Sequence, residues 1–152
     1  MKNLTLIFLL LFLSGCGYSS IYKNQQLQDF QLNIITTEGD YEMNNLIKNE
    51  IKLYSNEESQ NIYDIKIDTD YEKKVLTKNS SGVITDYNLS VITIFSINLK
   101  NQNENFKFEE NINIKNQSDT FEQNTYEKNI KRNFASSIRK KLFFAIMSLN
   151  DN

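Results

Sequence analysis

The fold of this chain follows from one stretch near its middle, Tyr63-Asp64-Ile65-Lys66-Ile67-Asp68-Thr69-Asp70-Tyr71. The odd-numbered positions carry aromatic, aliphatic or threonine side chains, whereas the even-numbered positions carry only Asp and Lys. Because successive side chains of a strand point to opposite faces, this alternation predicts a β-strand with one buried and one solvated face. A sheet that is wet on one side needs a second layer on the other side to bury its apolar face.

Two more strands are expected downstream, each after a turn. The cluster Asn79-Ser80-Ser81-Gly82 predicts a hairpin turn into a long strand over about residues 83–100. One face of that strand carries Tyr87, Leu89, Val91, Thr93, Phe95, Ile97 and Leu99. Ile92 and Ile94 add apolar groups to the opposite face, which fits either a central strand or a contact surface. Residues 101–104 predict a second turn, and the last strand then carries Phe106, Phe108, Ile112 and Ile114, with a bulge expected near Glu110.

Upstream of the quoted stretch, the pattern changes from strand to helix. Phe30 to Ile34 alternates and predicts a short strand, and Thr37-Glu38-Gly39-Asp40 offers residues that cap a helix N-terminus. A helix is expected over about Tyr41–Tyr54, since its apolar side chains recur at helical spacing. A second, longer helix is expected over about Glu122–Leu149, where Asp119 and Glu122 resemble a capping box.

The predicted order is therefore strand, helix, three strands, helix (β-α-β-β-β-α). A helix between the first two strands is a crossover, so these strands should run parallel, while tight turns make the last three antiparallel. The expected fold class is α+β: a two-layer sandwich in which two helices pack on one face of a four-stranded mixed sheet. Residues 30–152 form this single domain, and residues 16–29 are a polar connector ahead of it.

The first residues predict export and a lipid anchor. An apolar run from Leu4 to Leu13 follows Lys2 and ends at Leu13-Ser14-Gly15-Cys16, which is typical of a bacterial lipobox. Residues 1–15 are then a signal peptide, and the Cys16 sulfur carries the lipid. Two alternatives stay open: an ordinary signal peptide followed by a free or paired cysteine, and a transmembrane helix. The run is shorter than the roughly 20 residues that span a bilayer, and Cys16 is the only cysteine.

Composition excludes several classes of function. After residue 15 the chain keeps 16 of its 17 basic residues and all 19 acidic ones, a balance that does not favour nucleic-acid binding. It has no His, and its one Cys is assigned to lipid, so the usual zinc and copper ligand sets are missing, as are Ser-His-Asp and Cys-His catalysis. No cofactor is expected. A hydrolase that uses only carboxylates stays open, but nothing in the spacing of Asp64, Asp68, Asp70 and Glu72 marks a catalytic pair.

Several motifs, in this order, resemble the LPS-assembly lipoprotein family, LptE. These are Cys16-Gly17-Tyr18, the segment from Gly39 to Ile47, the hairpin from Gly82 to Leu89, and Tyr126-Glu127-Lys128 leading into Ile138-Arg139-Lys140-Lys141-Leu142. The resemblance covers essentially the whole chain after residue 15. The absence of a proline after Cys16, where many members have one, is the main departure in the connector.

The resemblance implies a binding role without enzymatic activity. The domain would plug an outer-membrane β-barrel, LptD, assist its assembly, and help to insert lipopolysaccharide (LPS) at the outer leaflet. It would be lipid-anchored to the outer membrane with its domain on the periplasmic side; Gly17, rather than Asp, after the cysteine agrees with this location. Phosphates attract basic side chains, and by position the candidate LPS-binding residues are Lys78, Lys128, Lys131 and Arg132. An accessory lipoprotein of another envelope transport or secretion complex is the alternative.

Overall fold

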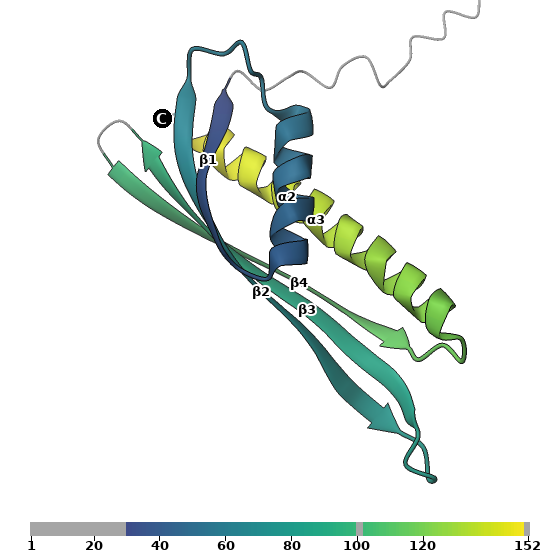
Figure 1. The fold of residues 1–152 in the computed structure, drawn as a ribbon. Coiled ribbons are helices and arrows are strands. Elements are labelled where there is room, and N and C mark those ends of the chain that lie inside the picture. The colour runs from purple at the N-terminus through teal and green to yellow at the C-terminus, as the bar shows by residue number, and fades with distance from the viewer. Residues whose placement is uncertain (1–29, 100–101, 151–152) are drawn as a thin grey trace, which may run out of the picture.

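The computed structural model describes residues 30–99 and 102–150 (Figure 1). The predicted signal peptide, Cys16 and the connector lie outside the described residues. The elements are β1 (Gln31–Gly39), α2 (Tyr41–Tyr54), β2 (Ile62–Lys78), β3 (Ile84–Leu99), β4 (Gln102–Lys115) and α3 (Thr120–Asn150). This β-α-β-β-β-α order confirms the predicted α+β fold, and the first helix has the bounds that its sequence pattern predicted.

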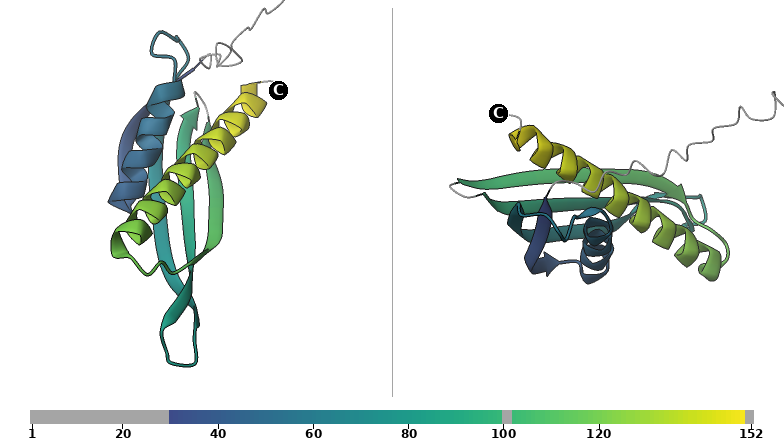
Figure 2. Two further views of the ribbon diagram at one scale, coloured as in Figure 1. Left: turned by 90° about the vertical axis from the view of Figure 1, so that its right-hand side faces the viewer. Right: turned by 90° about the horizontal axis from the view of Figure 1, so that it is seen from above.

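The four strands form one mixed sheet in the order β1-β2-β3-β4. β1 pairs with β2 in parallel, as the crossover helix requires, and β2, β3 and β4 pair antiparallel. Figures 1 and 2 show both helices on the same side of this sheet, with α3 crossing it diagonally beside α2. The molecule is thus a two-layer sandwich whose other sheet face has no second layer among residues 30–99 and 102–150.

The core lies between the sheet and the helices. The odd-numbered residues of β2 and β3 point into it: Ile65, Ile67, Leu89, Val91, Phe95 and Ile97 are all fully buried. α2 contributes Met43, Ile47 and Ile51, and α3 contributes Ile138, Leu142 and Ile146. Thr69 and Thr93 are also buried, and their hydroxyls lie 3.3 Å apart, so each satisfies the other inside the core.

The solvated face carries the even-numbered residues, and the alternation that predicted it is confirmed. Lys66, Asp68 and Asp70 are exposed. Ile94 of β3 is 37% exposed and lies between Asp68 of β2 and Lys107 of β4 in the register of the sheet. The apolar pair Ile92 and Ile94 therefore sits on a central strand, flanked by charged neighbours on both sides.

Two strands differ from expectation. The bulge predicted near Glu110 is wrong, because β4 keeps one unbroken register with β3. Glu110 points to the helix side, where it accepts a hydrogen bond from the hydroxyl of Ser137 and pairs with Lys141 (Nζ–Oε1 2.7 Å). Glu110 can therefore keep the regular strand register, because Ser137 and Lys141 of α3 supply its polar partners. A register shift occurs instead in β1, which is longer than predicted, between Ile34 and Thr36.

The β1–α2 junction is tightly built. Gly39 has a φ of +83°, and a Cβ added there would lie 2.0 Å from the carbonyl oxygen of Thr69, so only glycine fits. Asp40 then caps α2, since its side chain accepts a hydrogen bond from the backbone N–H of Met43 (2.8 Å). At α3, Asp119 accepts from the N–H of Glu122 (2.9 Å), which is one half of the predicted capping box.

β2 and β3 continue beyond the helices as a hairpin arm, defined here as residues 74–86 (Figure 1). From Glu72 to Val83 every side chain is exposed, including Val75 (42%), Leu76 (49%) and Val83 (56%). The turn at the tip is held by Asn79, whose side chain accepts hydrogen bonds from the N–H groups of Ser81 and Val83. Apolar and lysine side chains therefore share an arm that carries no helix layer.

Candidate functional site: basic residues of the arm and of α3

The four candidate residues fall into three different surroundings. Lys78 is the last residue of β2 and is exposed at the far end of the hairpin arm. Lys128 and Arg132 are exposed on α3, which begins beside the base of the arm (Figure 1). Lys131 instead contacts Glu42 of α2 and Tyr71 of β2. The structure therefore does not bring the four predicted residues together into one site.

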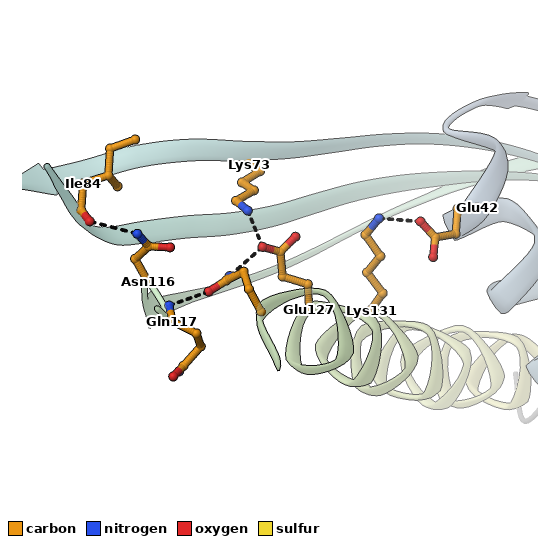
Figure 3. A network of polar contacts seen from close by, with 8 residues as sticks. Glu42, Lys73, Ile84, Asn116, Gln117, Glu127 and Lys131 are labelled. Atoms are coloured by element: carbon orange, nitrogen blue, oxygen red, sulfur yellow. Dashed lines mark hydrogen bonds and ion pairs between the residues drawn. The ribbon is translucent and has the colours of Figure 1, made fainter. Parts of the chain in front are cut away.

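Lys131 is part of the interior scaffold. Its side chain is 15% exposed, and its Nζ lies 2.6 Å from Oε2 of Glu42 on α2. The same ammonium lies 4.3 Å from the ring centroid of Tyr71 on β2, a cation–π contact. Lys131 thus connects α3 to α2 and β2. Figure 3 shows its ion pair with Glu42, which balances its charge. A lysine in this setting is a poor candidate for binding a phosphate.

A second lysine, Lys73, repeats this arrangement nearer the arm. Its ammonium pairs with Glu127 of α3 and lies 4.1 Å from the ring centroid of Tyr87 on β3. Each of the two lysines therefore stacks on a tyrosine of the sheet and pairs with a glutamate of a helix. The sequence pattern does not single out Lys73. Its one signal is Tyr87, which lies two residues from Leu89, the register partner of Lys73 on β3.

The Glu127 carboxylate also ties down the loop between β4 and α3. Glu127 accepts a hydrogen bond from the side-chain amide of Gln123 (2.6 Å), whose oxygen accepts from the N–H of Gln117 (2.7 Å). The next residue back, Asn116, donates from its side chain to the carbonyl of Ile84 (3.0 Å), which pairs with Lys78 toward the far end of the arm. Figure 3 shows this chain of contacts running from β3 to α3. These contacts connect the loop between β4 and α3 to both β3 and α3.

One pKa in this region is strongly displaced. Burial, together with the nearby carboxylates of Glu127, Glu42 and Asp40, raises the pKa of Tyr71 to about 12. Within the described chain, the buried hydroxyl of Tyr71 has no hydrogen-bond partner. At neutral pH this tyrosine is therefore uncharged and serves as a surface for the Lys131 ammonium.

Arg139 shows the same use of a cation in the interior. It is 8% exposed, and its guanidinium lies 3.8 Å from the ring centroid of Tyr54 on α2 and 3.7 Å from Oε2 of Glu50. The predicted basic side of α3 is thus divided. Lys131 and Arg139 hold α3 against α2, whereas Lys128, Arg132 and Lys140 lie four or eight residues apart and are exposed.

The exposed basic residues remain available to a ligand. Within the described residues, neither Lys78, Lys128, Arg132 nor Lys140 forms an ion pair. Beside Lys78, the arm exposes the apolar side chains of Val75, Leu76 and Val83. Hydroxyls of Thr77 and Thr85 hold the pKa of Asp86 below its usual range, so this carboxylate stays charged on the arm, opposite Thr77.

The acidic residues of β2 do not form a recognisable site among the described residues. Asp64, Asp68, Asp70 and Glu72 lie along one face of β2, two or four residues apart. In the part of the chain that the structure describes, no three or more acidic, His or Cys side chains gather in a way that could hold a metal ion. Among the same residues, no helix is both long and apolar enough to cross a membrane.

Comparison with known proteins identifies the fold. No protein-family model and no curated protein matches the sequence. The structure is similar to that of rare lipoprotein B from Shewanella oneidensis, with a TM-score of 0.56 and 17% identity over 78% of this chain and 99% of that one. It is also similar to a minor lipoprotein from Acinetobacter baumannii, with a TM-score of 0.54 and 10% identity over 77% of this chain and 92% of that one. Lipoprotein B from Nitrosomonas europaea has a TM-score of 0.52 and 9% identity over 81% and 88%. At these identities, the comparisons show a shared fold.

Proposed function

We propose that this chain is a lipid-anchored protein of the bacterial envelope, tethered through Cys16, that acts by binding rather than by catalysis. The observation that carries the proposal is the fold, which spans 99% of rare lipoprotein B and follows a lipobox-like sequence in this chain. Rare lipoprotein B is a lipoprotein by name, and the motifs of this chain resemble the LptE family of lipoproteins. Motif order thus supports the LptE family, and the shared fold supports a lipoprotein of the envelope.

The finer proposal is that the sandwich plugs LptD, the β-barrel of the LPS translocon in the outer membrane. A compact two-layer domain with one largely polar sheet face, which no described element covers, is suited to a water-filled lumen, because its polar side chains are exposed. In this role the protein would assist barrel assembly and the insertion of LPS at the outer leaflet. An accessory subunit of another envelope complex is the second candidate, because the same fold can serve more than one partner.

Co-purification separates these two candidates. The chain, with an affinity tag after residue 152, is expressed in the bacterium from which it comes. The cell envelope is then dissolved in detergent, and the tagged protein is captured together with its partners. We expect a large outer-membrane barrel protein in near-equal amount. Capture of inner-membrane transport components instead would overturn the barrel proposal and favour the accessory role. Loss of membrane association by Cys16→Ser tests the anchor in the same preparation.

For LPS, we propose that Lys78, Lys128 and Arg132 supply the cations and that the apolar residues of the arm meet acyl chains. LPS combines phosphates with acyl chains, and the arm combines Lys78 with exposed Val75 and Leu76. Lys131 is omitted from this set because Glu42 and Tyr71 already occupy its ammonium.

The binding surface is tested by charge reversal. Lys78→Glu combined with Arg132→Glu should weaken LPS binding by about tenfold, since two phosphate contacts are each replaced by repulsion. The thermal midpoint should not change, because both side chains are exposed. The matched control, Lys66→Glu with Lys107→Glu on the open sheet face, makes the same charge change elsewhere. Equal loss of binding in both double variants would mean that only net charge matters and would remove the proposed site.

A further inference from the structure

The two edges of the sheet are protected to different degrees. At the β4 edge, α3 lies close enough for Lys141 to donate to the backbone carbonyl of Glu109 (3.1 Å) and to pair with Glu110. At the β1 edge, side chains close only the two ends. Near one end, Ser55 accepts from the N–H of Leu32 (3.0 Å), and near the other Asn44 donates to the carbonyl of Glu38 (2.7 Å).

Between those two caps, the backbone groups of β1 that point away from β2 have no partner in the described chain. The N–H of Gln31 points toward β2 and donates to the carbonyl oxygen of Asn61, the residue just before that strand (2.8 Å). Residues alternate in direction along a strand, so Leu32 and Ile34 point their backbone groups to the free edge. The N–H of Leu32 reaches Ser55, which leaves the N–H and C=O of Ile34 open.

The bulge at Ile35 limits this open stretch. Ile34 pairs with Ile65 and Thr36 with Lys66, so Ile35 is an extra residue, and it is 52% exposed. Bulges on edge strands discourage the addition of a long strand. The open edge is therefore short and suits only a few residues of an extended peptide.

A hollow lies directly beside the open stretch, between β1 and α2. Its volume is about 230 Å³, and its lining residues include Leu32, Ile34 and Ile51 as the apolar part. Lys48 and Lys52, one turn apart on α2, and Glu57 supply the charged part. A neighbouring hollow shares Asn49, Lys52 and Glu57 and adds Leu53, which is 70% exposed.

The charges of this groove indicate what it would accept. Within the described residues, neither Lys48 nor Lys52 has a carboxylate partner, although other lysines of the domain do. Glu57 is the one acidic residue among those that line the hollow. The apolar floor with an unpaired basic rim is therefore complementary to an apolar side chain next to a carboxylate.

We propose that this edge groove binds a short extended segment of a partner protein by strand addition at Ile34. Side chains two residues apart in an extended segment point to the same face. The segment would therefore place a large apolar side chain over Leu32 and Ile51 and an acidic side chain, two residues away, between Lys48 and Lys52. Backbone pairing supplies affinity in this mode, and the pocket supplies specificity.

The test uses a synthetic peptide as the probe, acetyl-Thr-Ile-Thr-Glu-Thr-Ile-amide, with the chain from residue 16 onward carrying Cys16→Ser. NMR of the isotope-labelled protein should show shifts of the Ile34 and Ile35 amides and of the Ile51 methyl groups. Lys48→Glu with Lys52→Glu should weaken binding by about tenfold, because two attractive contacts become repulsive. Lys107→Glu with Lys115→Glu, an equal charge change on exposed positions of β4, should leave binding unchanged.

Three results would overturn the proposal. The first is the absence of Ile34 shifts at millimolar peptide, and the second is equal weakening by both double variants. The third is slow hydrogen exchange of the Ile34 amide in the protein alone. If that protection is lost on dilution, a second copy occupies the edge. If it is lost instead when Tyr22, an aromatic residue of the connector (residues 16–29), is changed to Asp, the connector of the same chain occupies the edge. None of these results bears on co-purification with a barrel, so the proposed function stands or falls separately.

Discussion

Strands β2 and β3 run through both the covered part of the sheet and the hairpin arm, yet the two parts differ in burial and in the partners of their lysine side chains. Up to Tyr71, alternate residues of β2 are buried under α2 and α3, and Ile65, Ile67 and Thr69 are fully enclosed. From Glu72 to Lys78, every side chain of β2 is exposed. The strand pairing continues with two register shifts, between Val75 and Lys78. A β-ladder can thus extend beyond its core, but burial ends where the helix layer ends.

The difference shows what each part can do. In the covered part, cations such as Lys131 and Arg139 stack on tyrosines and pair with glutamates, so they serve the fold. On the arm, Lys78 has no such partners among the described residues, and apolar side chains stand beside it. Binding of an amphipathic ligand is therefore expected on the arm rather than on the scaffold.

The comparison is tested most strongly with two leucines. Leu89 is fully buried, whereas Leu76 on the arm is 49% exposed. Leu89→Ala should lower the free energy of unfolding by about 2–5 kcal/mol, because it removes buried methyl groups and leaves a cavity. Leu76→Ala should lower it by less than about 0.5 kcal/mol. Urea unfolding measures both, and similar losses would mean that the arm packs against something in the isolated domain.

Two glycines give the next largest contrast. Gly39 and Gly82 both have positive φ, +83° and +79°, but a Cβ at Gly82 would meet nothing within 4 Å. Gly82→Ala should therefore cost only the left-handed backbone strain, about 1–2 kcal/mol. Gly39→Ala adds a collision with the Thr69 carbonyl and should cost at least about 1 kcal/mol more. Thermal unfolding of the two variants compares them, and equal midpoints would contradict the tight β1–α2 junction.

The smallest expected effect at neutral pH concerns Tyr71, at the boundary of the two regions. Its pKa is raised from 10.0 to about 12 by burial and by nearby carboxylates, so the folded state keeps a proton that the unfolded state loses first. The stabilisation is fully present below pH 10 and is lost as pH rises toward 12. Tyr71→Phe should remove this pH dependence and cost little at neutral pH, because the hydroxyl has no partner in the described chain.

The measurement for Tyr71 is the free energy of urea unfolding as a function of pH. Tyr126→Phe, at a 42% exposed position, is the matched control. An unchanged slope between pH 10 and 12 in Tyr71→Phe would show that other groups cause the alkaline loss of stability.

Much of the fold could be predicted because its causes are local. The alternation from Tyr63 to Tyr71 reports one buried face, and Asp40 after Gly39 marks the start of α2. The predicted bulge at Glu110 failed because a charge on the buried side was interpreted as a break in the strand. Ser137 and Lys141, far along the chain, make that charge acceptable.

The candidate site was less predictable. Lys128, Lys131 and Arg132 look equivalent as sequence, since each is a basic residue on the same stretch of α3. A helix turns by about 100° per residue, so neighbours in sequence point in different directions. Lys131 meets Glu42 and Tyr71, while Lys128 and Arg132 remain in solvent.

The order of elements, the buried face of each strand and the limits of α2 were determined by the amino-acid sequence itself, because periodicity and capping act over a few residues. The tertiary structure alone decided which lysines are free, where the helix layer stops along β2, and how each sheet edge is closed. Those outcomes depend on contacts between residues such as Lys131 and Glu42, separated by 89 positions in the chain. No local pattern reports such contacts, since they form only when the layers pack.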